Sequence, residues 1–189
     1  MKENDKIYRN WFVVQVKTGR EYYIKDVAGN NADEPVKMLI FTRELLFERQ
    51  KRLIKVISPL FPGYIFIHQK TKKFLDTMRT CLASEFIRPV CFKQKKCRIC
   101  FTDSSPCMVY RHEMKYLLDG SDSDGIFRVS KGVRLNKQVV ITDGPLKHWG
   151  GDIVWVNEKK KKACVELELF HRKLRVNLGI DMIEERKTG

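Results

Sequence analysis

The chain has 189 residues, a length that allows one ordinary domain or two small ones. Hydrophobic residues make up 43% and charged residues 32%, which excludes a disordered tail, and no window approaches the roughly 18 consecutive apolar residues of a membrane span. The 37 Lys and Arg residues outnumber the 23 Asp and Glu residues, and the resulting charge of +14 favours a polyanionic partner, most often nucleic acid.

The first ten residues are polar and carry no apolar stretch of a secretory signal, so we expect a cytoplasmic protein without a membrane partner. Residues 11–16 (WFVVQV) are rich in β-branched and aromatic side chains and predict a buried strand. Thr18 and Gly19 interrupt this run, and residues 21–28 then have the pattern of a helix.

Two β-prone runs, residues 38–47 and 51–57, flank a short polar stretch. They predict either a long hairpin or one strand followed by a basic, helix-like turn. Leu-Phe-Pro-Gly at 60–63 punctuates the chain, and residues 64–68 (YIFIH) predict another strand.

The remainder of the first half predicts a helix at 71–82, a strand at 86–92 and a helix at 107–118. The resulting order β-α-β-β-α-β, with one added helix, is typical of a ferredoxin-like α+β arrangement, in which helices pack on an antiparallel sheet.

After residue 118 the composition changes to a polar, glycine-bearing stretch, DGSDSDG, which predicts the start of a linker. Only strand patterns follow, at 139–141, 152–156, 163–170 and 172–178, and we expect a small five-stranded barrel. The expected organisation is an amino-terminal domain at 8–118, a linker at 119–131 and a second domain at 132–189.

The six cysteines do not predict disulfides, since the cytosol keeps thiols reduced. Two of them, Cys97 and Cys100, have the spacing of a zinc knuckle, and Cys91 and Cys107 lie near enough in sequence to complete four ligands. The second pair lacks the short spacing, and Cys91 sits in an apolar stretch, so plain cysteines are favoured and no metal site is predicted.

No catalytic motif, phosphate loop or dinucleotide fingerprint occurs, and the four histidines are scattered at 68, 112, 148 and 171. We therefore predict a protein that is not an enzyme and needs no cofactor.

Two groups of motifs resemble the NusG family of transcription elongation factors. Residues 11–21 (WFVVQVKTGRE) and 60–67 (LFPGYIFI) resemble its amino-terminal domain. Three further segments resemble the small KOW barrel of the same family: residues 139–147 (VVITDGPLK), 150–154 (GGDIV) and 163–170 (ACVELELF). The resemblance covers the chain from residue 11 to about residue 184 and supports the fold class above, a ferredoxin-like domain joined to a five-stranded KOW β-barrel.

Departures from the family pattern concentrate in the KOW loop, where the usual Gly-Pro-Phe-x-Gly-x-x-Gly becomes GPLKHWGG at 144–151. His148 replaces the first loop glycine, and Trp149 is expected to be exposed. Further on, Phe-Gly-Arg becomes FHR at 170–172, and Asn177 replaces an acidic residue. The added basic and aromatic character favours a specialised paralog that resembles the LoaP group of antiterminators.

The resemblance implies that the amino-terminal domain docks on the clamp of RNA polymerase through an aromatic patch of Phe61, Tyr64 and Phe66. Durable binding needs desolvated aromatic anchors, although the same side chains would look alike in a core. Lys70, Thr71 and Lys72 lie where the family places a loop that meets the opposite jaw of the polymerase, or they form a solvated helix start.

For the second domain we predict contact with a nascent RNA hairpin, because basic side chains meet phosphates and aromatic ones stack on unpaired bases. The candidates are Lys147, His148, Trp149, Lys160, Arg172, Lys173 and Arg175. Lys160 belongs to a lysine run at 159–162 that also fits a solvated turn. A second basic group on the expected hairpin could reach upstream DNA: Arg49, Lys51, Arg52 and Lys55.

We therefore expect a monomeric elongation and antitermination factor that binds RNA polymerase and a leader RNA. One alternative is a general NusG-like factor whose KOW domain binds a ribosomal or termination protein. Another is a ribosome-associated KOW protein with no polymerase contact, and a zinc-dependent binding module is a third.

Overall fold

The computed structural model describes residues 7–30, 32, 35–68, 87–88, 107–135, 138–149, 152–170 and 172–183. The helix expected at 71–82 lies outside these residues. The chain divides into two compact units, residues 1–40 with 61–115, and residues 41–60 with 116–189. Within the described part, no helix is both long enough and apolar enough to cross a membrane.

The first unit is built on an antiparallel sheet with strand order β2-β5-β1-β6, in which β7 also pairs with β1. Its strands are β1 (Trp11–Val16), β2 (Lys37–Leu39), β5 (Tyr64–His68), β6 (Ile87–Arg88) and β7 (Cys107–Val109). The helix expected to begin at residue 107 is therefore corrected: β7 comes first, and α3 spans Arg111–Gly120.

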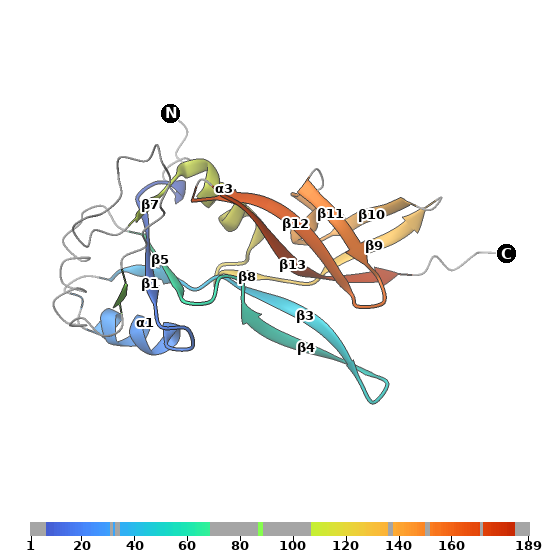
Figure 1. Cartoon of the computed structure of the whole chain (residues 1–189), viewed down its shortest axis with the longest axis horizontal. Helices are drawn as coiled ribbons and strands as arrows, with labels where there is room; N and C mark the ends of the chain where they lie inside the picture. Colours follow the sequence, from blue (N-terminus) through green and yellow to red (C-terminus); the bar gives the residue numbers. More distant parts are fainter. Residues whose placement is uncertain are drawn as a thin grey trace. The chain divides into compact units, whose positions relative to one another are not determined.

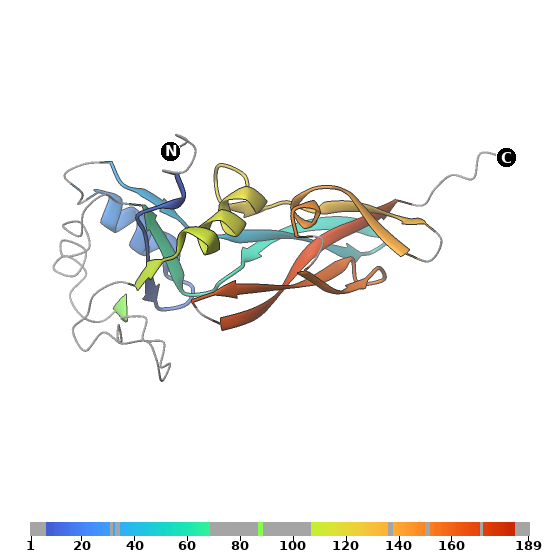
Figure 2. The same cartoon turned by 90° about the horizontal axis from the view of Figure 1, so that it is seen from above.

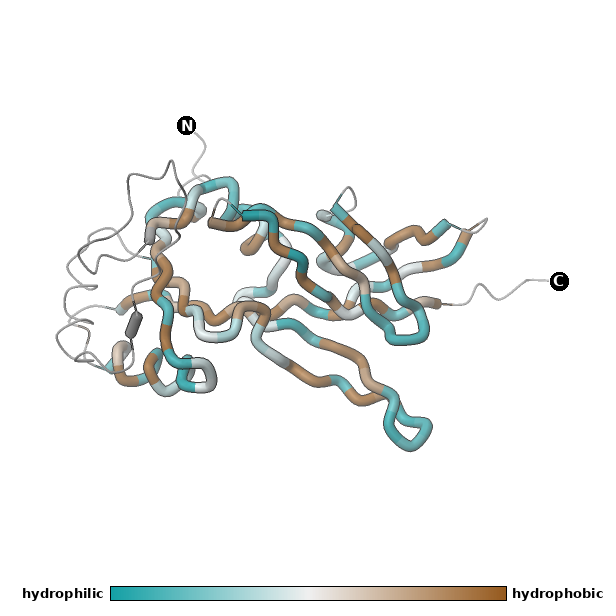
Figure 3. Tube along the Cα trace, viewed as in Figure 1, coloured by the Kyte–Doolittle hydropathy of each residue, from teal (hydrophilic) through white to brown (hydrophobic). Residues whose placement is uncertain are grey.

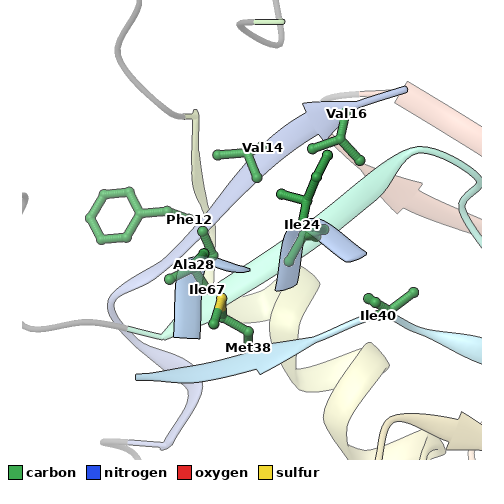
Figure 4. Close-up of a cluster of buried hydrophobic side chains, with 9 residues drawn as sticks. Phe12, Val14, Val16, Ile24, Ala28, Met38, Ile40 and Ile67 are labelled. Atoms are coloured by element: carbon green, nitrogen blue, oxygen red, sulfur yellow. The ribbon is translucent and has the colours of Figure 1, made fainter. Parts of the chain in front are cut away.

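Helix α1 (Glu21–Asn30) covers one face of this sheet because its buried residues Glu21, Ile24 and Ala28 recur at helical spacing. Figure 4 shows Ile24 and Ala28 among side chains from β1, β2 and β5. The members of this cluster are Phe12, Val14, Val16, Ile24, Ala28, Met38, Ile40, Ile65 and Ile67. Trp11 and Val13 point to the opposite face and are also fully buried, so β1 is enclosed on both sides.

The second unit contains the long hairpin of β3 (Thr42–Arg49) and β4 (Arg52–Pro59), drawn as a two-stranded ribbon in Figure 1. Of the two sequence interpretations, the hairpin is thus confirmed. Gln50 and Lys51 form its two-residue turn with φ of 49° and 60°, the backbone that type I′ turns require. A short strand, β8 (Ile126–Phe127), pairs in parallel with the base of β3.

A five-stranded sheet completes the second unit, with the order β10-β9-β13-β12-β11. Figure 2 draws this part of the chain in yellow-orange to red. Its strands are β9 (Ser130–Leu135), β10 (Gln138–Asp143), β11 (Ile153–Asn157), β12 (Lys162–Leu169) and β13 (Arg172–Ile183). No pairing joins β10 to β11 among the described residues, so the sheet is a half-barrel, and the closed KOW barrel expected from sequence is not confirmed. The stretch expected as a linker, 119–131, contains β8 and the start of β9.

Close contacts tie the base of the hairpin to β13. The Arg43 guanidinium donates a hydrogen bond of 2.9 Å to the carbonyl oxygen of Asn177. A Cβ atom at Gly179 would lie 2.4 Å from the carbonyl oxygen of Glu44, so only glycine allows the two strands to approach this closely. These contacts are why the hairpin belongs to the same compact unit as the half-barrel.

Candidate functional site

The Leu-Phe-Pro-Gly motif orients the start of β5. Gly63 donates its N–H to the buried carboxylate of Glu21 at 2.6 Å, and its carbonyl oxygen accepts from the N–H of Val16 at 2.7 Å. Its φ is 83°, and a Cβ there would come within 2.9 Å of the Val16 carbonyl oxygen. A glycine is therefore required where the end of β1, the start of α1 and the start of β5 meet.

The three aromatic residues predicted to bind polymerase differ in exposure. Phe66 is fully buried, Phe61 is nearly so, and their ring centroids lie 6.0 Å apart. Tyr64 is half-buried and shares the strand face of Phe66, since side chains two residues apart lie on one face. Of these three side chains, Tyr64 is partly exposed, while the two phenylalanines pack in the core. Lys70, Thr71 and Lys72 lie outside the described residues.

Sequence reasoning missed two exposed aromatics on α1, Tyr22 and Tyr23, which are 56% and 53% exposed. They lie outside the buried stripe of Glu21, Ile24 and Ala28, so helical spacing could have identified them. The Arg20 guanidinium carbon lies 5.7 Å from the centroid of the Tyr23 ring. This helix end thus presents a cation beside an aromatic surface.

In the KOW-like loop, the expectation that Trp149 is exposed is wrong: it is 2% exposed, and its ring centroid lies 5.2 Å from that of Phe127. The reason is the 3₁₀ turn η2 (Pro145–Lys147), which places residues three apart on the same side. Leu146 and Trp149 therefore point inward together, while Lys147 and His148 are exposed. Two of the three predicted loop residues remain accessible to a ligand.

The basic residues of β13 are exposed, and a neighbouring carboxylate neutralises part of their charge. Glu166, on the adjacent strand β12, accepts hydrogen bonds from Lys173 at 3.0 Å and from Arg175 at 3.2 Å. The Lys173 ammonium and then the Arg175 guanidinium lower the pKa of the Glu166 carboxyl, and Glu166 in turn raises the pKa of Lys173. Arg172 is also exposed. An incoming phosphate would compete with Glu166 for two of these three cations.

Three lysines of the run at 159–162 lie in the turn between β11 and β12, as one sequence interpretation proposed, and Lys162 begins β12. Lys159 and Lys160 are exposed, and the backbone N–H of Lys160 donates to the side chain of Asn157. Lys161 instead forms an ion pair of 2.8 Å with Asp181, and the Lys162 ammonium lies 5.0 Å from the centre of the Phe47 ring. Two lysines of the run are thus directed to solvent, and two serve the fold.

Trp155 is an exposed aromatic that sequence reasoning did not select. It is 44% exposed on β11, an edge strand of the half-barrel, and its neighbour Val154 is 43% exposed. The pairing register shifts between Ile153 and Trp155, an irregularity of the kind that redirects side chains on edge strands. The run Ile-Val-Trp-Val is apolar throughout, so no alternation in the sequence distinguished the exposed tryptophan.

The tip of the β3–β4 hairpin is strongly basic. Arg49, Lys51 and Arg52 are all exposed around the two-residue turn, with Glu48 as the acidic neighbour. Lys55 is 64% exposed and lies 3.4 Å from the carboxylate of Glu44. The prediction that four cations share an extended hairpin is confirmed, and contact with DNA stays a prediction.

Most of the predicted cysteine cluster lies outside the described residues. Cys91, Cys97 and Cys100 lie outside the described residues, and for Cys107 only the backbone strand is described. Across the described ranges no group of three or more His, Cys, Asp or Glu residues could hold a metal ion. Cys164 is a buried free thiol on β12.

Comparison with known proteins points to one family. A family model described as "Transcription termination factor nusG" matches residues 9–115, which is more than half of the chain. A solved structure titled "Domain interaction in Thermotoga maritima NusG" is similar at 18% identity and a TM-score of 0.47, covering 92% of this chain and 95% of that one. Among proteins of curated function, no sequence matches.

Proposed function

The chain belongs to the NusG family of transcription elongation factors, and from this premise we propose that it is a specialised antitermination factor. In this proposal the unit containing β1 and β5 binds the clamp of RNA polymerase, and the half-barrel binds a hairpin in nascent leader RNA. The factor acts as a cytoplasmic monomer and needs no enzymatic step.

The polymerase half of the proposal is supported by the family match, because NusG proteins bind RNA polymerase and residues 9–115 include the whole sheet of the first unit. Tyr64 supplies a partly exposed aromatic next to the rigid glycine turn at Gly63. Phe61 and Phe66 support that surface from within the core. Lys70, Thr71 and Lys72 are proposed to contact the opposite jaw of the polymerase.

The observation that carries the RNA half is Trp155, a large aromatic ring left exposed on an edge strand. A stacking platform beside cations is how proteins hold unpaired bases and their phosphates. Lys159 and Lys160 lie in the turn that follows β11. Further exposed candidates of the same unit are Lys147, His148, Arg172, Lys173 and Arg175. Trp149 does not belong to this set, because its side chain is buried in the core.

The two contacts would act together through effective concentration. A leader RNA that is still attached to its polymerase holds the factor next to the clamp, so the second binding event becomes intramolecular. This gain in polymerase binding is restricted to transcripts that carry the hairpin. Read-through follows if the bound factor disfavours the paused polymerase that precedes release.

A single-round transcription assay with the full-length protein tests this proposal. We expect more read-through on templates that encode a recognised leader hairpin, and a loss of that gain in Trp155→Ala. Base stacking contributes about 1–3 kcal/mol per base, so RNA affinity should fall by roughly one order of magnitude.

The matched control is Tyr22→Ala, which removes an aromatic side chain of the other unit that is 56% exposed, against 44% for Trp155. It should leave RNA affinity unchanged. The contrary result is that both variants bind every RNA with the same affinity and that this affinity falls steeply as the salt concentration rises. Binding would then come only from counterion release, and recruitment by RNA would be ruled out.

A second candidate is favoured by the two outer strands of the half-barrel, β10 and β11, each of which has one strand neighbour among the described residues. Val140 on β10 and Val154 on β11 are 41% and 43% exposed, which suits a protein ligand better than RNA. In that case the half-barrel binds a ribosomal or termination protein, as in a general NusG-like factor. Complex formation with such a protein, together with an absence of hairpin preference, would favour this candidate.

A further inference from the structure

Strand β4 is exposed on both faces, which is unusual for a strand with this composition. All six residues from 52 to 57 are exposed, and four of them are large aliphatic residues: Leu53, Ile54, Val56 and Ile57, each between 40% and 51% exposed. Figure 3 shows hydrophobic stretches along the hairpin and a hydrophilic turn at its end. Because side chains alternate along a strand, Leu53 and Ile57 lie on one face and Ile54 and Val56 on the other, and large aliphatic residues exposed in this way mark an interaction site.

β4 also ends its sheet. The strand order is β4-β3-β8, so the outer edge of β4 is unpaired in the described part of the chain. Arg49 and Arg52 face each other across the two-residue turn, and in such a hairpin this closing pair exchanges both hydrogen bonds. The pattern alternates, so the N–H groups of Leu53, Lys55 and Ile57 point away from β3. They form a row of donors available to another strand.

The charge around this edge selects the occupant. Arg49, Lys51 and Arg52 surround the tip, against one exposed acid, Glu48. The other acid of the hairpin, Glu44, is buried and bound by Lys55, Arg128 and the N–H of Val129. A second copy of the same strand would bring like charges together, which disfavours self-pairing.

Nucleic acid suits the tip but not the strand, since phosphates make no use of aliphatic side chains on both faces. We propose that β4 is a docking edge for an extended, acidic segment of a partner protein, which adds to the hairpin as a further strand. Backbone hydrogen bonds to Leu53, Lys55 and Ile57 would provide affinity, and the aliphatic faces and basic tip would provide selectivity. This function goes beyond RNA recruitment and is independent of it.

The probe is a synthetic heptapeptide of alternating Glu and Val residues, added to the full-length protein. Its control carries N-methyl groups on four consecutive central residues, which keeps the net charge and removes two inter-strand hydrogen bonds whichever edge of the peptide faces β4. We expect the first peptide to bind at least about tenfold more tightly, since each lost hydrogen bond contributes roughly 1 kcal/mol. Amide hydrogen exchange should slow at Leu53, Lys55 and Ile57 when it binds.

Two variants at one position separate pairing from hydrophobic contact. Leu53→Pro removes an outward N–H, and Leu53→Thr removes the aliphatic side chain but keeps that N–H. We expect Leu53→Pro to lose about fivefold in affinity for the alternating peptide, and Leu53→Thr to lose clearly less. The inward N–H groups of Ile54 and Val56 must stay protected in both variants, which verifies that the hairpin is folded.

Equal affinity for the two peptides, or binding without slowed exchange at the outward amides, would overturn the proposal and leave only charge attraction. Slowed exchange that rises with protein concentration in the absence of peptide would identify a second copy as the occupant. Protection of the same amides by duplex DNA, but not by the peptide, would identify nucleic acid instead. None of these outcomes depends on Trp155, so failure here is distinguishable from failure of the RNA proposal.

Discussion

Strands β1 and β11 have similar compositions and opposite environments. β1 contains Trp11 and is central, with β5 on one side and β6 and β7 on the other, whereas β11 contains Trp155 and lies at the edge of the half-barrel. Trp11 is fully buried, and Trp155 is 44% exposed. Whether an aromatic residue is available for binding therefore depends on whether its strand is central or at the edge of the sheet. The residue type alone does not decide it.

The largest expected effect tests this comparison directly. Trp11→Ala should lower the free energy of unfolding by about 3–5 kcal/mol, because it leaves a cavity in the core. It also removes the hydrogen bond of 2.8 Å from the indole N–H to the Ile7 carbonyl oxygen. Trp155→Ala should change the same quantity by less than about 1 kcal/mol. Denaturant unfolding followed by circular dichroism measures both, and similar losses would contradict the comparison.

Gly179→Ala should have the next largest effect, on the attachment of the hairpin to β13. The new Cβ would lie 2.4 Å from the Glu44 carbonyl oxygen, so the strands must move apart, at a cost of about 1–3 kcal/mol. Gly29→Ala is the matched control because its nearest neighbour is 3.5 Å away and it lies in α1. That variant should be neutral or stabilise by up to about 1 kcal/mol. Destabilisation of equal size in both would show that the close approach is unimportant.

The turn before β8 should make stability depend on pH. Burial alone would raise the pKa of Asp122, but hydrogen bonds from the N–H of Ile126, from Arg128 and from the N–H of Asp124 lower it overall. A carboxyl with a lowered pKa stabilises the fold above its unfolded pKa, and this contribution is lost as the pH falls through its folded pKa.

Asp122→Ala should therefore lower stability by about 1 kcal/mol at neutral pH. The difference from the natural protein should shrink once the pH is below the folded pKa of Asp122. Urea unfolding at several pH values measures this difference. If it stays constant down to strongly acidic pH, the carboxylate does not hold this turn in its ionised form.

The smallest effect concerns the exposed cations of β13. Glu166→Gln should raise affinity for the leader RNA about twofold, because Lys173 and Arg175 lose their competing carboxylate. Stability should change little, since this pair is exposed to solvent. RNA titration at two salt concentrations provides the measurement. Unchanged or weaker binding would place the RNA on another part of the half-barrel.

Several features could be predicted because they depend on short-range sequence patterns. The strands at 11–16 and 64–68, the helix that begins at Glu21 and the β3–β4 hairpin all follow from local composition and spacing. The prediction that Trp149 is exposed was wrong because a 3₁₀ turn, with its period of three, directs Trp149 inward together with Leu146. The strand β7 was mistaken for helix because its three residues pair with β1, a contact between residues far apart in sequence.

The sequence by itself determined the family, the mixed helix and sheet composition, and the basic charge, because each depends only on which residues occur and in what order. The tertiary structure alone decided which aromatic residues reach the surface and that Glu166 binds the side chains of Lys173 and Arg175. It also decided that β4 has no strand partner on its outer edge in the described part of the chain. It also grouped the hairpin with the half-barrel, a unit that the proposed division at 119–131 does not anticipate. The physical reason is that exposure and pairing depend on neighbours brought together by folding, such as Glu44 and Gly179, which are distant along the chain.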